Sequence, residues 1–120
     1  MSHYVDGFIL SIKRSKLPAY TRLARKAAKV WRDCGALEYR ECAAEDVNAP
    51  GLIPFPKLAQ SKPGEVVIFA WAVFKSRRHR DATNKRIMAD PRMAGMCEEA
   101  KQLVDCKRMA YGGFKSIVTL

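Results

Sequence analysis

The chain has 120 residues, of which 48% are hydrophobic and 28% are charged. This length allows one domain with an ordinary hydrophobic core, expected over residues 1–120, and the composition excludes a disordered chain. The 22 Lys and Arg residues against 12 Asp and Glu give a net charge of +10, which favours anionic partners. No apolar run approaches the roughly 20 residues of a membrane-spanning helix, so we expect no membrane span.

The N-terminal residues and the cysteines predict a cytoplasmic protein. Residues 1–6 have no basic region and already include Asp6, so we expect no signal peptide. The four cysteines include no C-x-x-C pair, which argues against zinc and thioredoxin-type sites and favours reduced thiols in a cytoplasm. His3 and His79 are the only histidines. We therefore expect no metal and no cofactor.

The first third of the chain predicts a strand, a helix and a second strand. Residues 4–12 are rich in β-branched and aromatic side chains, as strands are. Ser15 is the expected N-cap of the helix, Pro18 falls within its first turn, and Gly35 supplies its C-terminal stop. Residues 36–43 then alternate well enough for a strand.

The periodicity disappears over residues 44–63. A loop of this length is unusual in a compact domain and often has a function. Apolar residues are interspersed with its prolines, so we expect a packed flap rather than a free linker. The prolines and glycine are Pro50, Gly51, Pro54, Pro56 and Pro63.

The second half of the chain repeats the strand–helix–strand order. Residues 65–74 form the clearest strand, and Ser76 is placed to cap a helix that ends at residue 89, before an Asp-Pro pair. A short further helix is expected over residues 93–103, and the last strand over residues 106–119. The order β-α-β-β-α-β is that of the ferredoxin-like α+β sandwich, which has an antiparallel sheet with both helices on one face.

The strand over residues 65–74 is apolar on both faces, although a half-solvated antiparallel strand should alternate. Something must therefore cover the second sheet face, and the chain has no spare element large enough. A second copy of the protein is the simplest cover, so we expect a homodimer. Its interface would be the face that carries Phe69 and Trp71, or else the opposite face.

Several segments of the chain form a recognisable set. They are residues 4–8, Trp71, Arg80-Asp81-x-x-Asn84, Met88-x-Asp90-Pro91-Arg92-Met93 and Lys107-Arg108-Met109-x-Tyr111-Gly112-Gly113-Phe114. Together they resemble a YbaA-like bacterial family of unknown function. That family is similar to the dimeric α+β barrels, in which two ferredoxin-like sheets pack face to face. The resemblance thus implies the same fold and dimer, and it implies no activity.

Asp6 is the first candidate site residue, because the strand pleat places its carboxylate on a largely apolar face. Buried without a partner, it would have a raised pKa and could serve as a general acid or base. The alternatives are a structural ion pair with Arg108 or Arg40, or a position at the strand end that is exposed to solvent. Dimeric α+β barrels hold small molecules between helices and sheet, and the expected lining of such a pocket is Asp6, Trp71, Arg108 and Tyr111.

Arg80 and Asn84 lie one helical turn apart on the second predicted helix and recur in the resemblance. They could support the Gly112–Gly113 backbone, where we expect a bulge or a close backbone approach. They could also hold the carboxylate of a ligand.

A basic face on the first predicted helix favours a different function. It consists of Arg22, Arg25, Lys26, Lys29 and Arg32. Such a face attracts phosphate backbones or an anionic membrane surface, and the predicted order of strands and helices is also that of an RNA-recognition motif. The strand that contains Phe69 and Trp71 partly imitates the aromatic platform of that motif, but it lacks the basic residue and glycine expected upstream.

The sequence therefore predicts a homodimeric, cytosolic, ferredoxin-like protein that binds a small molecule. Whether it is an enzyme stays open, and any catalysis would be acid–base chemistry without a metal, because the sequence has no hydrolase triad, phosphate loop or dinucleotide fingerprint. RNA binding through the basic face is the alternative.

Overall fold

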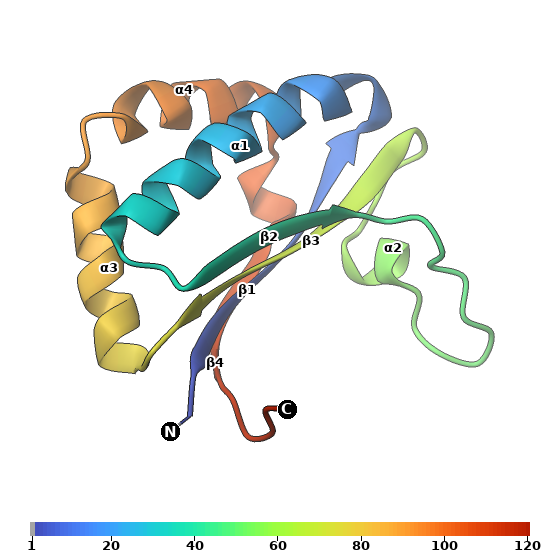
Figure 1. Ribbon diagram of the computed structural model, residues 1–120. Coiled ribbons are helices and arrows are strands. Elements are labelled where there is room, and N and C mark those ends of the chain that lie inside the picture. The colour runs from blue at the N-terminus through green and yellow to red at the C-terminus, as the bar shows by residue number, and fades with distance from the viewer. Residues whose placement is uncertain (1) are drawn as a thin grey trace.

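A computed structural model describes residues 2–120 and shows a sheet with a layer of helices on one face (Figure 1). The strands form one antiparallel sheet in the order β2-β3-β1-β4. They are β1 (Tyr4–Lys13), β2 (Glu38–Ala43), β3 (Glu65–Phe74) and β4 (Ala110–Lys115). The longer helices are α1 (Leu17–Cys34), α3 (Arg77–Ala89) and α4 (Met93–Leu103), and α2 (Phe55–Leu58) is a single turn. The predicted ferredoxin-like α+β sandwich is confirmed.

Two predicted caps have different outcomes. The Ser76 hydroxyl accepts a hydrogen bond from the backbone N–H of His79 at 3.1 Å, so α3 is capped as predicted. Ser15 does not cap α1, because residues 14–16 form a separate 3₁₀ turn and the helix begins at Leu17. At the other end of α1, Gly35 has φ 125°, a left-handed conformation that a Cβ atom disfavours.

The last strand is shorter than predicted. Cys106–Arg108 form a 3₁₀ turn, and β4 pairs with β1 only from residue 110. The pairing is continuous through Gly112 and Gly113, so the expected bulge is absent. A side chain, and not another backbone, approaches closely here: a Cβ atom on Gly113 would lie 2.5 Å from the Tyr4 hydroxyl oxygen.

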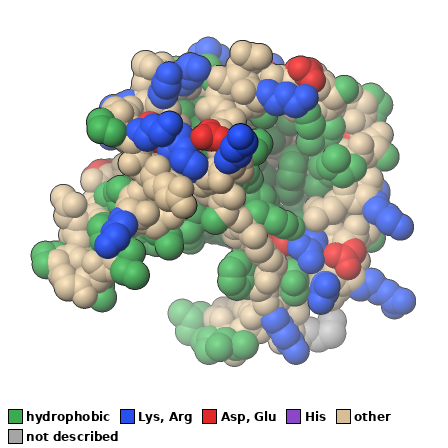
Figure 2. Space-filling view, turned by 180° about the vertical axis from the view of Figure 1, so that it is seen from behind, with side chains coloured by type: hydrophobic (Ala, Val, Ile, Leu, Met, Phe, Trp, Pro, Cys, Tyr) green, Lys and Arg blue, Asp and Glu red, His purple; other side chains and the backbone are tan. Residues whose placement is uncertain are grey.

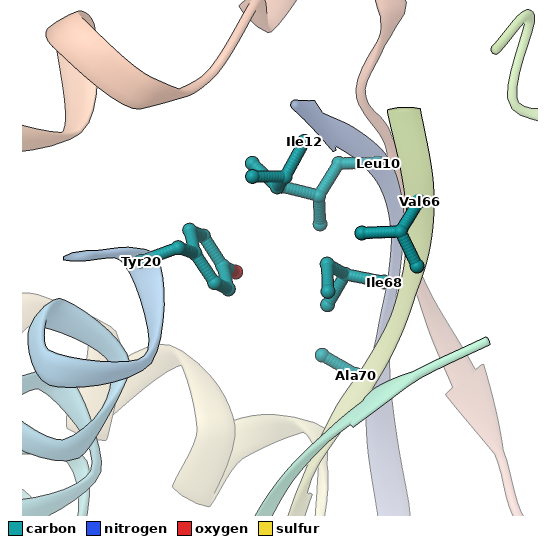
Figure 3. Close-up of a cluster of buried hydrophobic side chains, with 6 residues drawn as sticks. All are labelled: Leu10, Ile12, Tyr20, Val66, Ile68 and Ala70. Carbon is teal, nitrogen blue, oxygen red and sulfur yellow. The ribbon is translucent and has the colours of Figure 1, made fainter. Parts of the chain in front are cut away.

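The core lies between the sheet and α1. Figure 3 shows the ring of Tyr20 pointing from α1 toward side chains of the two central strands. These side chains share one face of the pleat, and β3 follows β1 in antiparallel register. The cluster consists of Leu10, Ile12, Tyr20, Val66, Ile68 and Ala70, each at most 9% exposed.

The segment over residues 44–63 packs its C-terminal half on the second face of the sheet. The backbone carbonyl of Ala59, which is 1% exposed, accepts a hydrogen bond from the Ser11 hydroxyl, and that hydroxyl also contacts the Ser61 hydroxyl. The ring of Phe55 meets the ring of Phe69 at 5.8 Å between centroids. This segment therefore covers only one end of the second face.

The rest of the second face is uncovered and apolar, and we call it the open face. It forms a shallow hollow of about 640 Å³. Two aromatic side chains on it are strongly exposed, Phe69 at 43% and Phe114 at 62%. The open face comprises Val5, Gly7, Ile9, Phe69, Trp71, Val73, Ala110, Gly112 and Phe114.

Among the helices of the described residues, none has the length and the apolar character that crossing a membrane requires.

Candidate functional site

A cavity of about 220 Å³ lies between the sheet, α1 and α4. We call it the inner cavity. Its walls are mostly apolar, and hydrophobic side chains line a recess beneath the helical layer in Figure 2. Small molecules usually bind in concave, mainly apolar sites with a few polar groups. The apolar walls include Phe8, Leu10, Trp31, Met93, Met96 and Met109.

One wall of the inner cavity carries three polar side chains. The hydroxyl of Tyr20, from α1, donates to Oε1 of Glu41 on β2, and the hydroxyl of Tyr39 donates to Oε2 of the same carboxylate. Burial and the neighbouring Glu41 carboxylate both raise the pKa of the two tyrosines, so their hydroxyls stay protonated. The three side chains therefore form a stable, negatively charged cluster, which we call the acidic cluster.

The acidic cluster has no cation beside it among the described residues. No Lys or Arg nitrogen there lies within 4.0 Å of the Glu41 carboxylate. Arg25 and Arg40 line a separate groove between α1 and β2, to which Tyr20, Tyr39 and Glu41 also contribute. The acidic cluster thus separates a groove with two arginines from the apolar cavity.

A second polar cluster joins β1, β4 and α3. Nη1 of Arg80 donates to Oδ1 of Asp6 at 2.7 Å and to the Tyr111 hydroxyl oxygen at 2.8 Å. The Tyr111 hydroxyl and the Asn84 side chain also lie near the Asp6 carboxylate and favour its charged form. The Arg80 guanidinium lies 4.9 Å above the ring of Tyr4. Burial raises the pKa of Asp6, and the guanidinium, Tyr111 and Asn84 oppose the rise.

Phe8 contacts both the inner cavity and the second polar cluster. The Phe8 side chain lines the inner cavity, and its ring packs against the Tyr111 ring at 4.9 Å between centroids. Asp6 and Phe8 project on the same face of β1, since alternate residues of a strand share a face. The second cluster therefore borders the inner cavity without lining it.

The predicted partners of Asp6 are wrong. Arg108 forms a bidentate pair with Glu65, at 2.7 and 2.8 Å, and also contacts Asp105. Residue 108 lies in the 3₁₀ turn before β4, so its side chain cannot reach the Asp6 end of β1. Arg40 projects over the Trp71 ring.

The residues predicted to line one pocket lie at different places in the structure. Asp6, Arg80, Asn84 and Tyr111 come together, whereas Arg108 lies near the opposite end of β1. Trp71 lies on the open face, where its indole N–H donates to Glu38 at 2.6 Å. Trp71 pairs with Gly7, the neighbour of Asp6 on β1, so its side chain projects on the opposite face of the sheet from Asp6.

Sequence reasoning missed the acidic cluster. The alternation of β2 places Tyr39 and Glu41 on one face, which the sequence does indicate. Tyr20 belongs to the apolar stripe of α1 and gives no sign that its hydroxyl reaches β2. The contact between Tyr20 and Glu41 depends on where α1 crosses the edge of the sheet. No pattern in the chain specifies the distance between α1 and β2.

The basic face of α1 is on the protein surface. Its five cationic side chains are exposed, and they include Lys26, which lies 3.8 Å from Glu99, and Arg32, which pairs with Asp33. Within residues 2–120, no three His, Cys, Asp or Glu side chains are grouped so that they could hold a metal ion. Cys34 is buried, and Cys42, Cys97 and Cys106 are exposed free thiols.

Residues 3–105 match the model of a protein family, DUF1428, whose members are described as proteins of unknown function. The uncharacterized protein YbaA of Escherichia coli K12 is 40% identical over 115 residues, which cover 96% of this chain and 97% of YbaA. The YbaA of Shigella flexneri matches equally well. The chain belongs to this family. The resemblance seen in the sequence is therefore confirmed.

Solved structures with low sequence identity share the fold. A NIPSNAP domain protein from Burkholderia xenovorans has a TM-score of 0.64 at 13% identity, and the match covers 98% of this chain and 94% of that one. A nipsnap family protein with unknown function from Agrobacterium tumefaciens has a TM-score of 0.58 at 17% identity, with 94% and 86% covered. A protein from an uncultured marine organism, described as dimeric and ferredoxin-like, has a TM-score of 0.58 at 8% identity, with 100% and 98% covered.

Proposed function

We propose that this member of the family is a homodimeric protein that binds one small, largely apolar molecule in the inner cavity of each subunit. The observation that carries the proposal is the cavity itself, with about 220 Å³ of space between the sheet, α1 and α4. A cavity of about 150 Å³ is enough for benzene. The space therefore suits a molecule of one ring with a short substituent.

The chemistry of the walls supports binding rather than a packing defect. A well-packed core leaves few voids larger than a water molecule. The inner cavity also combines apolar walls with one polar group of fixed geometry, the acidic cluster, which is the usual make-up of a ligand site.

We do not propose a general acid or base role for Asp6. The Asp6 side chain is 2% exposed, its Oδ1 atom is paired with Arg80, and Tyr111 and Asn84 enclose it further. These contacts fit a structural ion pair, because a carboxylate enclosed in this way has no open position for a substrate.

The open face supports the dimer. Uncovered apolar strands of this extent are unusual on a monomer and invite pairing with another surface. A protein described as dimeric shares the fold. The cytoplasmic location that we propose rests on the free cysteines, which a reducing compartment maintains.

A pair of variants on α4 tests the binding proposal. Ala100 lines the inner cavity and Ala94 is exposed on the same helix. We expect small aromatic molecules to shift the NMR signals of residues around the cavity in the natural protein. The same molecules should cause no such shifts in Ala100→Phe, because the new ring fills the cavity. In the control Ala94→Phe they should shift the same signals as in the natural protein. Equal binding by all three proteins would place the molecules elsewhere and refute the proposal.

The exposed basic face of α1 supports one alternative, the binding of RNA or another polyanion. Replacement of Arg22, Arg25 and Lys29 by Gln would then abolish RNA retention, with a steep loss of affinity in salt for the natural protein. RNA affinity that is absent, or unchanged by the triple replacement, would exclude this alternative.

A further inference from the structure

We propose that the ligand of the inner cavity is a small apolar amine, held as its ammonium form by Glu41, Tyr20 and Tyr39. This inference rests on the proposed function and names the chemical class of the ligand. The evidence comes from the hydrogen bonds of the acidic cluster, its charge and the aromatic side chains around it.

The acidic cluster can only accept hydrogen bonds from a ligand. Each tyrosine hydroxyl has one proton, and both protons are donated to the Glu41 carboxylate. The positions left over are lone pairs on the carboxylate and on the two hydroxyl oxygens. An ammonium group has three N–H donors and no acceptor, so it complements these positions. A carboxylate or phosphate would meet only acceptors and would be repelled.

The charge of the acidic cluster leads to the same ligand class. Glu41 is half-buried against an apolar cavity, with no Lys or Arg nitrogen of the described residues within 4.0 Å. The two arginines nearby in the chain, Arg25 and Arg40, line the outer groove and not the cavity. A carboxylate in such surroundings is stabilised when a cation enters on the cavity side.

The aromatic wall favours a cation as well. The rings of Trp31 and Tyr39 pack at 5.6 Å between centroids, and both side chains line the inner cavity. Tryptophan is the most favourable aromatic partner for an ammonium group. The remaining walls, with Phe8, Met93 and Met96, suit the apolar body of the ligand.

The test compares three probes of nearly equal size, 2-phenylethylamine, 2-phenylethanol and phenylacetate, by calorimetric titration at neutral pH. We expect the amine to bind about tenfold or more tightly than the alcohol, because hydrogen bonds to a charged group are the stronger ones. Phenylacetate should not bind measurably. The variant Glu41→Gln should lose the amine preference and keep the affinity for the alcohol.

The matched control is Glu38→Gln, which lies on the same strand but contacts Trp71 on the open face. It should keep the amine preference. Equal affinity for amine and alcohol, or an amine affinity that Glu41→Gln leaves unchanged, would overturn the ligand class while the binding function stands. Failure of all three probes to bind would overturn both the ligand class and the proposed binding function. A preference for phenylacetate would show that the ligand is an anion and not a cation.

Discussion

Arg80 and Asp6 are 74 positions apart in the chain, and their side chains meet at 2.7 Å across the boundary between α3 and the sheet. Asp6 is almost fully buried on β1, and the Arg80 side chain is only 12% exposed. The same guanidinium lies over the ring of Tyr4 and donates a hydrogen bond to the hydroxyl of Tyr111, so it helps to position both tyrosines. The pair therefore attaches α3 to the two strands on this side of the sheet.

Removal of the Arg80 cation should lower the unfolding free energy more than neutralisation of the Asp6 carboxylate does. Arg80→Gln leaves a buried carboxylate without its cation, which costs about 3–5 kcal/mol in unfolding free energy. Asp6→Asn keeps the shape and leaves Arg80 with its second partner, Asp81. It also removes a charge that burial disfavours, as the raised pKa of Asp6 indicates. We expect a smaller loss for Asp6→Asn, measured by urea unfolding.

The control for this comparison is Asp81→Asn, whose side chain is 60% exposed and whose loss should cost at most about 1 kcal/mol. In Arg80→Gln the pKa of Asp6 should rise further, so the folded state takes up a proton that the unfolded state does not. The difference in unfolding free energy between Arg80→Gln and the natural protein should then decrease as the pH falls from 7 toward 5. A difference that increases over this range would contradict the assignment of the ion pair.

The pair of Glu65 and Arg108 leads to a second prediction on pH dependence, which concerns more acidic solutions. Hydrogen bonds from Arg108 hold the pKa of Glu65 at about 2, below its usual 4.5. A lowered pKa stabilises the fold at neutral pH, and this contribution is lost as the pH falls through about 4.5 toward 2. Glu65→Gln should therefore destabilise the protein by about 1–3 kcal/mol at pH 7 and by almost nothing near pH 2. Thermal unfolding across that range measures the difference.

Glu45→Gln serves as the reference for this series, because Glu45 is exposed in the segment between β2 and α2. It should leave stability nearly unchanged at every pH. A Glu65→Gln protein whose deficit persists at pH 2 would show that packing at residue 65, and not its charge, stabilises this end of the sheet.

The fold was predictable because each element has its own local signal. β3 has ten residues, most of them β-branched or aromatic, and α3 has a serine cap at its start and an Asp-Pro pair just beyond its end. The ends of two elements differ from the prediction: α1 begins after Ser15, and β4 begins only at residue 110, after a 3₁₀ turn over residues 106–108. Local patterns describe the interior of an element better than its ends.

The candidate site was predictable only in part, because side-chain partners depend on tertiary distances. The sequence grouped Asp6 with Tyr111, which the antiparallel pairing of β1 and β4 brings together. It assigned Arg108 to Asp6 because both are charged and lie on or near neighbouring strands, but register determines which charges meet. The contact between Tyr20 and Glu41 requires the position of α1 over β2, for which the chain has no local pattern.

The open face leads to the last prediction, which concerns assembly. A stable dimer buries about 800 Å² on each subunit, and the uncovered strands with Phe69, Trp71 and Phe114 offer an apolar centre for such an interface. Phe114→Arg places a charge there and should convert a dimer into a monomer or an aggregating chain, as sedimentation velocity would show. Met88→Arg makes the same change at an exposed position of α3, outside the open face, and should leave the dimer intact. A natural protein that sediments as a monomer at micromolar concentration would refute the interface, as would a Phe114→Arg protein that stays dimeric.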